Sequence, residues 1–396
     1  MKSAINESAQ PYGDIFMKIR CCTFMRMAEE IRENNQKIIL FGAGAIGTVI
    51  TPEILSDNGL VQQIACYIDN DSRKWGTEIQ AAGANIKVLS PEYLKENGAG
   101  SAILLNISRY AEALSQLENL AGESDLTCYV IPLMCIHNFT NPPEHGSIKD
   151  SASPLIPKRI HYMWLGGKPL PESLQNCVDS WKKYCPDYEI IRWDESNYDV
   201  HKHPYMKQAY QRGAYGFVPD YARLDILYRY GGIYMDTDVE LIRPLDELLY
   251  QEAFCGVEKW QVLNFGGCSG AVPGHDAVRK ILDDREDIRF IDETGTENRN
   301  TCGFYDTRAI LKYGYKINGR NQNIAGMNIY TYDYFHPYDY MSGQTEITAN
   351  TFSIHHFNGG WLDETMKQMN RRAKEAFRGV CERMLFEDDE NADRNV

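Results

Sequence analysis

Residues 218–242, VPDYARLDILYRYGGIYMDTDVELI, predict a helix that passes directly into a strand. The first part, VPDYARLDILYRYGG, has the spacing of a helix and closes on glycine, which is typical of a helix C-terminus. The second part, GIYMDTDVELI, opens with a short apolar run that predicts a buried strand. A helix followed at once by a buried strand is typical of an α/β domain.

Two aspartates, Asp236 and Asp238, follow the apolar part of this strand. Successive strand residues point to opposite faces, so the two carboxylates are expected on the same face. Carboxylates placed this close repel each other unless a positive charge lies between them, and a divalent metal that holds a diphosphate supplies that charge. Open α/β sheets also bind ligands at this end of a strand. The bland alternative is a chance D-x-D in an acidic protein.

Polar residues elsewhere in the chain support the metal interpretation of this aspartate pair. Asp220 and Arg223 lie three residues apart on the preceding helix and therefore share a face. They predict contacts to a sugar or diphosphate, although an exposed ion pair worth a fraction of a kcal/mol is the alternative. Near the C-terminus, His355 and His356 precede Trp361. Neutral imidazole is a good ligand for manganese, although a histidine pair is often structural.

Strands and helices alternate on both sides of this stretch. In the second half, LIPKRIHYMWLGG predicts a strand that ends in glycines, SLQNCVDSWKKYCPD a helix and YEIIRWDE another strand. In the first half, KIILFGAG, IACYIDND, SAILLNIS and CYVIPL predict strands with helices between them. The expected fold class is α/β, with an N-terminal Rossmann-like, doubly wound domain and a second α/β domain. The expected boundaries are an N-terminal helical segment (1–36), the Rossmann-like domain (37–140), a linker (141–154), the second domain with a C-terminal basic helix (155–386) and an acidic disordered tail (387–396).

The N-terminal domain carries a glycine pattern typical of dinucleotide sites. Gly42, Gly44 and Gly47 match G-x-G-x-x-G between a strand and a helix. Asp69 ends the next strand, where an acidic residue would accept hydrogen bonds from ribose hydroxyls. The pattern predicts NAD or another nucleotide at this loop. The alternative is that the glycines serve only the packing of a tight turn.

The composition narrows the classes of partner. Lys plus Arg (41) against Asp plus Glu (55) gives a net charge of −14, which disfavours nucleic acid. The N-terminal residues lack the apolar segment of a signal peptide, and no stretch has the roughly 18 apolar residues of a membrane span. Eleven cysteines without a C-x-x-C motif indicate buried, reduced thiols. The expected location is the cytoplasm.

Four segments together resemble glycosyltransferase family 32, a group that includes bacterial capsular polysaccharide transferases and fungal initiating mannosyltransferases. They are IPKRIHYMWLGG, SWKKYCPDYEIIRWD, VPDYARLDILYRYGGIYMDTDV and SIHHFNGGW, and they span residues 154–365. The resemblance implies a GT-A fold, a nucleotide-diphosphate sugar donor, a divalent metal (Mn²⁺ or Mg²⁺) and retention of anomeric configuration. The N-terminal FGAG and IDND segments resemble small domains attached to bacterial polysaccharide-biosynthesis enzymes.

The resemblance also implies roles for the metal-site residues. Asp238 matches the direct metal ligand, and Asp236 matches a contact to ribose and metal-bound water. His356, five residues before Trp361, matches the remaining protein ligand. One departure is that the family motif usually ends in Gly-Ser-Trp, whereas this chain has Gly360 before the tryptophan. A hydroxyl beside the diphosphate is thereby lost.

Further matches concern donor binding. Asp220 and Arg223 match contacts to the donor sugar, and Trp361 matches an indole that donates to the diphosphate. Trp164 matches the aromatic residue that stacks on the nucleobase, although it could simply be part of the core. Asn264 lies where such enzymes contact the transferred sugar, although the glycines around it could simply form a tight loop.

The expected function is retaining transfer of a hexose, with a UDP-sugar favoured over GDP-mannose. The expected acceptor is a saccharide or lipid-linked oligosaccharide of capsular or surface polysaccharide synthesis, and this rests on the resemblance alone. The basic helix expected at 367–383 predicts peripheral membrane contact, with packing on the domain as the alternative. Two other functions remain open. One is an NAD-dependent sugar oxidoreductase or nucleotide sensor that uses the N-terminal glycines, and the other is a degenerate transferase that acts as an interaction module.

Overall fold

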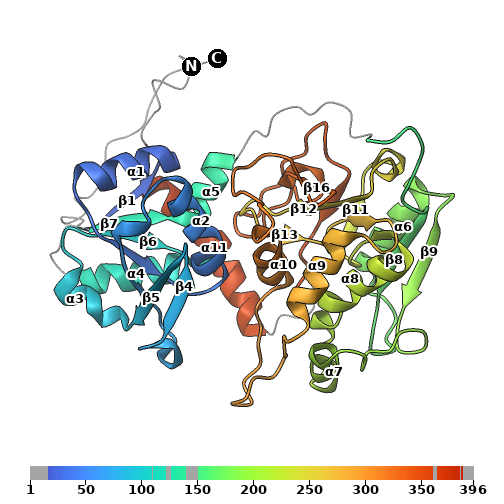
Figure 1. The fold of residues 1–396 in the computed structure, drawn as a ribbon, viewed down its shortest axis with the longest axis horizontal. Helices are drawn as coiled ribbons and strands as arrows, with labels where there is room; N and C mark the ends of the chain where they lie inside the picture. The colour runs from blue at the N-terminus through green and yellow to red at the C-terminus, as the bar shows by residue number, and fades with distance from the viewer. Residues whose placement is uncertain are drawn as a thin grey trace. The chain divides into compact units, whose positions relative to one another are not determined.

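The computed structural model describes residues 17–108, 110–121, 126–139, 150–359, 364–383 and 385–386. The chain forms two compact units, drawn from blue to red along the sequence in Figure 1. Unit 1 combines residues 1–134 with 379–396, and unit 2 comprises residues 135–378. Most of the expected linker, the acidic tail and Trp361 lie outside the described residues.

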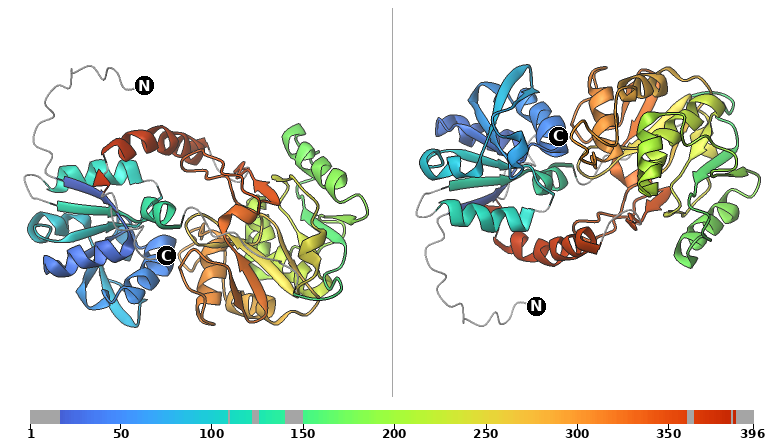
Figure 2. Two further views of the ribbon diagram at one scale, coloured as in Figure 1. Left: turned by 90° about the horizontal axis from the view of Figure 1, so that it is seen from above. Right: turned by 90° about the horizontal axis from the view of Figure 1, so that it is seen from below.

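Unit 1 is built on an eight-stranded sheet in the order β18-β1-β7-β6-β2-β3-β5-β4. All neighbouring strands are parallel except β4 and β5, which form an antiparallel hairpin. Helices cover both faces of this sheet (Figure 2). The strands are β1 (Met17–Cys21), β2 (Ile38–Phe41), β3 (Ile64–Ile68), β4 (Glu78–Ala81), β5 (Ala84–Leu89), β6 (Ala102–Leu105), β7 (Leu126–Val130) and β18 (Leu385–Phe386). The helices are α1 (Phe24–Glu33), α2 (Thr51–Asp57), α3 (Leu94–Asn97) and α4 (Tyr110–Ala121), and α5 (Ile131–Phe139) begins in unit 1 and continues into unit 2.

The N-terminal part of unit 1 differs from the sequence-based prediction. Residues 1–36 were predicted to be a helical segment outside the domain, but β1 lies within the sheet between β7 and β18. In β1, Met17, Ile19 and Cys21 are buried, and they alternate with Lys18 and Arg20. A five-residue strand gives too short a period-2 signal to stand out from the adjoining helix α1. The α/β class is nevertheless confirmed.

Unit 2 is built on a mixed sheet in the order β15-β16-β12-β14-β10-β8-β9, with β13 paired to β12. Strand β14 is antiparallel to both neighbours, whereas β8, β9 and β10 run parallel. A separate two-stranded sheet joins β11 to β17. The strands are β8 (Arg159–Met163), β9 (Glu189–Trp193), β10 (Gly232–Tyr234), β11 (Val239–Leu241), β12 (Ala253–Val257), β13 (Leu263–Asn264), β14 (Ser269–Ala271), β15 (Gln322–Ile324), β16 (Met327–Tyr330) and β17 (Ser353–His355). The helices are α6 (Glu172–Tyr184), α7 (Pro204–Gln211), α8 (Pro219–Tyr230), α9 (Asp276–Arg285), α10 (Cys302–Leu311) and α11 (Glu364–Arg383).

The core of unit 2 holds the small sheet against the large one. Ile233 of β10 and Val239 of β11 belong to the same buried cluster as Trp181 of α6. The Trp181 indole N–H donates to the Val239 carbonyl at 2.7 Å. Because Trp181 is fully buried, its packing and this hydrogen bond fix the start of β11, and therefore the end of the loop that carries the aspartate pair. All eleven cysteines of the chain are free thiols.

The strand predicted over GIYMDTDVELI is interrupted. Strand β10 ends at Tyr234 and β11 begins at Val239, so Asp236 and Asp238 lie in the connection between two sheets and not on one strand face. The Asp236 N–H donates to the Gly266 carbonyl at 2.8 Å, and the chain then turns away to pair with β17. Alternation along a strand was therefore the wrong reason to expect the carboxylates side by side.

The C-terminal helix α11 contains the basic segment, residues 367–383, that was expected to be helical. Its Lys374 Nζ donates to the Tyr338 hydroxyl of unit 2 at 2.7 Å, whereas residues from 379 onward belong to unit 1. Val380 is buried, and β18 follows within the sheet of unit 1. Among the described residues, no helix has the length and apolar character needed to cross a membrane.

Candidate functional site

Three side chains of unit 2 converge after the end of β10. Asp236, Asp238 and His355 each offer one ligand atom, and these atoms lie within 4.8 Å of one another. The pairing of β11 with β17 sets Val239 opposite His355, which brings the imidazole Nε2 to 3.3 Å from Asp238 Oδ1. The Asn358 N–H donates to the other Asp238 oxygen at 2.8 Å. Two segments more than a hundred residues apart thus form one cluster.

The histidine of this cluster is not the one chosen from the sequence. Neighbouring residues on β17 and just beyond it point to opposite sides, and the buried His355 faces the aspartates. The partly exposed His356 instead places Nε2 3.0 Å from Glu240 Oε2. The geometry therefore favours His355 over His356 as a metal ligand. The sequence-based choice of His356 rested on its spacing from Trp361, which contains no information about how β17 pairs with β11.

Asp238 and His355 shift each other's pKa in opposite directions. Burial alone would raise the pKa of Asp238, but the His355 charge and hydrogen bond, together with the Asn358 N–H, lower it to about 2. Burial works against the charged form of His355 as well, yet Asp238 and Asp236 raise its pKa above the usual value. Each of the two groups therefore favours the charged form of the other. Two carboxylates and an imidazole are donors that fit Mn²⁺, whereas Mg²⁺ prefers oxygen ligands alone.

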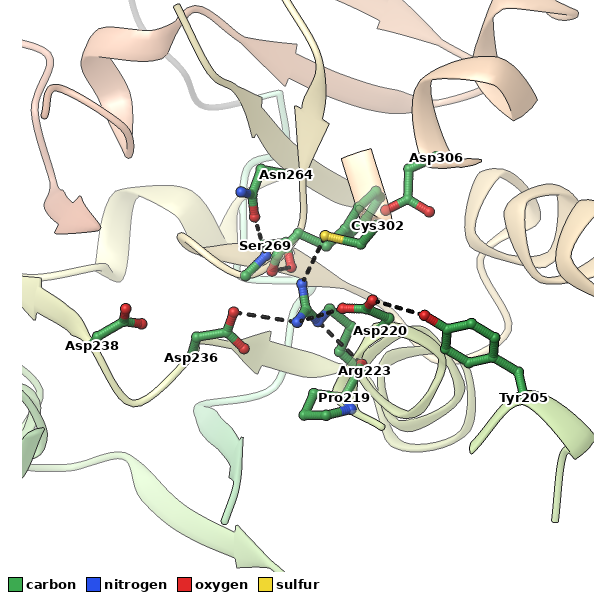
Figure 3. Close-up of polar contacts among 12 residues, drawn as sticks. Tyr205, Pro219, Asp220, Arg223, Asp236, Asp238, Asn264, Ser269, Cys302 and Asp306 are labelled. Carbon is green, nitrogen blue, oxygen red and sulfur yellow. Dashed lines mark hydrogen bonds and ion pairs between the residues drawn. The ribbon is translucent and has the colours of Figure 1, made fainter. Parts of the chain in front are cut away.

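Arg223 links this cluster to helix α8 (Figure 3). Its Nη2 lies 3.2 Å from Asp236 Oδ2 and 3.3 Å from Asp220 Oδ1. Its Nε donates to the Pro219 carbonyl at 3.1 Å, and its Nη1 lies 3.5 Å from the Cys302 thiol. The side chains of Asp220 and Arg223 are both less than a tenth exposed, so the alternative of an exposed surface ion pair is excluded. A buried guanidinium aimed at Asp236 is a fixed positive charge at the site.

A second buried ion pair joins helices α9 and α10, next to α8. Arg285 of α9 and Asp306 of α10 lie 2.6 Å apart, and both side chains are almost fully buried. The Tyr205 hydroxyl lies 3.3 Å from Asp220 Oδ2. Burial raises the pKa of Asp220 to about 6, and Arg223 and Arg285 only partly offset that increase. These supporting residues carry no recognisable motif, so only the packing of α7, α9 and α10 reveals them.

Asn264 and Gly266 form the loop opposite Asp236. The Asn264 Oδ1 accepts the Gly266 N–H at 2.8 Å, and the Gly266 carbonyl accepts the Asp236 N–H. A Cβ atom at Gly266 would lie 2.2 Å from Asp236 Oδ2 and 3.0 Å from Arg223 Nη1. Residue 266 must therefore lack a side chain for the loop to approach the carboxylate this closely. The glycines around Asn264 serve packing, as the alternative interpretation proposed, and Asn264 still lies beside the site.

Trp164 lies immediately after β8, the strand next to β10. Its N–H donates to the Trp193 carbonyl at 2.9 Å, and its indole N–H donates to the Lys168 carbonyl at 2.6 Å. The ring is partly buried against the core of unit 2, which leaves part of it accessible. Stacking on a nucleobase stays a prediction. Gly360 and Trp361 lie outside the described residues.

The glycine loop of unit 1 is explained largely by packing. Gly42 has a φ of +103°, and a Cβ at Gly47 would lie 2.0 Å from the Gly42 carbonyl oxygen. Nothing lies within 4 Å of a Cβ at Gly44. Asp69 Oδ2, predicted to face ribose, accepts the Ala43 N–H at 2.8 Å and lies 3.0 Å from Lys74 Nζ. In this structure Asp69 therefore fixes the loop itself.

Comparison with known proteins places a recognised region on this site. Residues 171–255 match the family model described as "Glycosyltransferase sugar-binding region containing DXD motif". This region includes Asp220, Arg223 and the aspartate pair, and it excludes Trp164 and both histidines.

Similar proteins include inositol phosphoceramide mannosyltransferase 3 of Schizosaccharomyces pombe, 37% identical over 27% of this chain and 31% of that protein. A mannosyl phosphorylinositol ceramide synthase of Saccharomyces cerevisiae is 30% identical over 36% of this chain and 39% of its own length. The chain thus spans about a third of the curated relatives it matches. Among solved structures, PaToxG glycosyltransferase aligns with a TM-score of 0.32 and 16% identity over 52% of this chain and 78% of that chain. Residues 171–255 of unit 2 are thus similar to the sugar-binding region of DXD-containing glycosyltransferases, and the aspartate pair of that region lies in the connection between β10 and β11.

Proposed function

We propose that unit 2 is a metal-dependent glycosyltransferase that moves a hexose from a nucleotide-diphosphate sugar to a saccharide or lipid-linked acceptor with retention of configuration. The observation that carries the proposal is the convergence of Asp236, Asp238 and His355 within 4.8 Å beside the buried Arg223. A carboxylate pair, an imidazole and a fixed guanidinium suit a diphosphate and its cation better than any uncharged ligand. The mixed sheet, in which β8, β9 and β10 run parallel and β14 is antiparallel to both of its neighbours, agrees with the GT-A expectation.

The residues of the chain supply binding and charge. Asp236, Asp238 and His355 would hold the metal, which when bound offsets the charge that develops on the leaving diphosphate. Arg223 already faces Asp236 and is fixed by the Pro219 carbonyl, so it provides a donor that needs no reorganisation during the reaction. Asn264 lies in the same neighbourhood as Asp236 and Arg223 (Figure 3), and its amide is the group that we expect to contact the transferred sugar.

The donor and acceptor follow from chemistry and resemblance. The mannosyltransferase names of the fungal relatives favour mannose, whereas the sequence-based preference was a UDP-sugar. Those names also bring a phosphoinositol lipid into consideration as the acceptor, beside the growing surface polysaccharide that we infer from family resemblance. A role for the glycine loop of unit 1 in binding NAD or another nucleotide is a separate prediction, and the engagement of Asp69 with Ala43 and Lys74 weakens the NAD version.

The test is hydrolysis of a panel of UDP- and GDP-sugars by the full chain, with Mn²⁺ and with EDTA. Metal-dependent release of one nucleoside diphosphate, abolished in Asp238→Ala, is the expected result. Asp276→Ala serves as the control, because Asp276 is an exposed partner of Lys280 on α9. Hydrolysis that is unchanged in Asp238→Ala with excess Mn²⁺ would refute the assignment.

A further inference from the structure

Glu258 is a carboxylate beside the site that neither belongs to the metal cluster nor contacts Arg223. Glu258 follows β12 directly, and the β12–β13 hairpin folds it back toward Asn264, with its N–H donating to the Val262 carbonyl at 2.9 Å. The Asn264 amide Nδ2 donates to Glu258 Oε1 at 2.8 Å. The residue is only partly exposed. A partly buried carboxylate at the end of a central strand requires partners for both of its oxygens.

The second carboxylate oxygen of Glu258, Oε2, has no hydrogen-bond partner among the described residues. The neighbouring Lys259 turns away and places Nζ 3.1 Å from Glu346 Oε2. Burial raises the pKa of Glu258 to about 7, although the Asn264 hydrogen bond and the His355 charge act in the opposite direction. The carboxyl group therefore has one free acceptor in a partly desolvated position.

Glu258 is connected to both aspartates of the site. On one side, Asn264 Oδ1 accepts a hydrogen bond from the Gly266 N–H, and the Gly266 carbonyl accepts one from the Asp236 N–H. On the other side, Glu258 interacts electrostatically with His355, whose Nε2 is 3.3 Å from Asp238 Oδ1. The Glu258 carboxylate accordingly lies beside Asn264 and within electrostatic range of His355.

Aromatic rings line the same neighbourhood. The Phe357 ring stacks on His355 at 4.0 Å between centroids, and the Tyr340 ring lies 5.0 Å from Phe357. Both Phe357 and Tyr340 are partly exposed, and Tyr340 also interacts electrostatically with Glu258. A pyranose has apolar C–H faces and a rim of hydroxyls, so aromatic rings beside a free carboxylate and a primary amide form a surface of matching chemistry.

We propose that Glu258 is a sugar-contacting residue: its free oxygen accepts hydrogen bonds from hydroxyls of the transferred hexose, while Tyr340 and Phe357 pack on the apolar face of that hexose. Asn264 is the adjacent amide contact, and Glu258 also fixes its orientation. The inference rests on the proposed function, because it takes the donor to be a nucleotide-diphosphate sugar.

The test compares binding of the donor with binding of its nucleotide alone. Calorimetric titrations with Mn²⁺ use UDP, UDP-glucose, GDP and GDP-mannose on the full chain and on Glu258→Ala and Glu258→Gln. In Glu258→Ala we expect the nucleotide-sugar to bind about tenfold more weakly or worse while the matching nucleoside diphosphate binds as in the wild type. Glu258→Gln should lose less, since its amide oxygen can still accept from Asn264. Glu252→Gln is the matched control, because Glu252 is exposed and lies just before the other end of β12.

The outcomes separate this inference from the proposed function. If the wild type binds no nucleoside diphosphate with Mn²⁺, the proposed function fails first. If it does bind and Glu258→Ala retains the wild-type ratio of nucleotide-sugar to nucleotide affinity, the inference is wrong. If donor hydrolysis is intact in Glu258→Ala but transfer to an added acceptor is lost, Glu258 contacts the acceptor, and the assignment to the donor hexose is overturned.

Discussion

Replacing Gly266 with alanine tests whether the loop opposite Asp236 positions the metal cluster. The added Cβ would lie 2.2 Å from Asp236 Oδ2, whereas ordinary contact begins at 3.4 Å. The carboxylate or the loop must therefore move by about 1.2 Å, the difference between these two distances. A displacement of this size by the carboxylate would break its 3.2 Å contact with Arg223.

The expected loss is large in activity and modest in stability. A misplacement of about 1 Å in a preorganised site can reduce turnover by about 100-fold, or roughly 2.7 kcal/mol of transition-state stabilisation. Overpacking costs about 1–3 kcal/mol of folding free energy, and the domain therefore remains folded at 25 °C. The assay is metal-dependent donor hydrolysis, with the unfolding temperature and the Mn²⁺ affinity measured on the same preparations.

Gly270→Ala is the matched control. Its Cβ would lie 2.5 Å from the Phe254 ring in the core, and its nearest neighbours do not include Asp236. We expect this variant to lose a comparable amount of stability but to retain turnover within about threefold. The reasoning is refuted if Gly266→Ala retains wild-type turnover, or if both variants lose activity in proportion to their loss of stability.

Three further predictions concern charge. His355→Ala should lower the Mn²⁺ affinity by tenfold or more, on the order of 1.4 kcal/mol, whereas His356→Ala should change it little. Calorimetric titration with Mn²⁺ measures both affinities, and the reverse order of the two variants would contradict the geometry. The pKa of His355 is raised above its usual value and metal binding requires the neutral ring, so the Mn²⁺ affinity of the wild type should rise with pH and level off above that pKa, whereas in His355→Ala this rise should be absent. Asp306→Ala leaves Arg285 buried without its carboxylate and should cost about 3–5 kcal/mol in denaturant unfolding, against less than about 1 kcal/mol for the exposed control Asp276→Ala.

The helices and strands of unit 2 were largely predictable because each carries its own periodicity. Residues 173–187 and 218–230 have apolar positions at helical spacing, and the predicted strands at 155–167 and 188–195 contain β8 and β9. Strand β1 was missed because its neighbours in the sheet are β7 and β18, which come from distant parts of the sequence. Pairing between such distant segments leaves no local pattern in the sequence. For the same reason, the sequence did not indicate that the C-terminal residues belong to unit 1.

The site was predictable in its composition and less so in its geometry. Asp220, Arg223 and the aspartate pair were recognised from spacing on one continuous stretch, and the structure brings them together. The choice between His355 and His356 depends on the register of β17 against β11, which is set by packing and not by the motif. Glu258 escaped notice because a single carboxylate in an acidic chain becomes informative only when its free oxygen is found beside Asn264.

The arrangement also explains how two adjacent carboxylates persist before a metal arrives. Each has its own cation: Asp236 faces Arg223 at 3.2 Å, and Asp238 faces His355 at 3.3 Å. The two cations differ in kind, because a guanidinium keeps its proton whereas an imidazolium can release one. In the proposed function, Asp236, Asp238 and the neutral ring of His355 would hold the divalent ion, while Arg223 keeps its charge beside Asp236 and would face the diphosphate. The proposed site would therefore offer ligands for the cation and a permanent positive charge for the anionic donor.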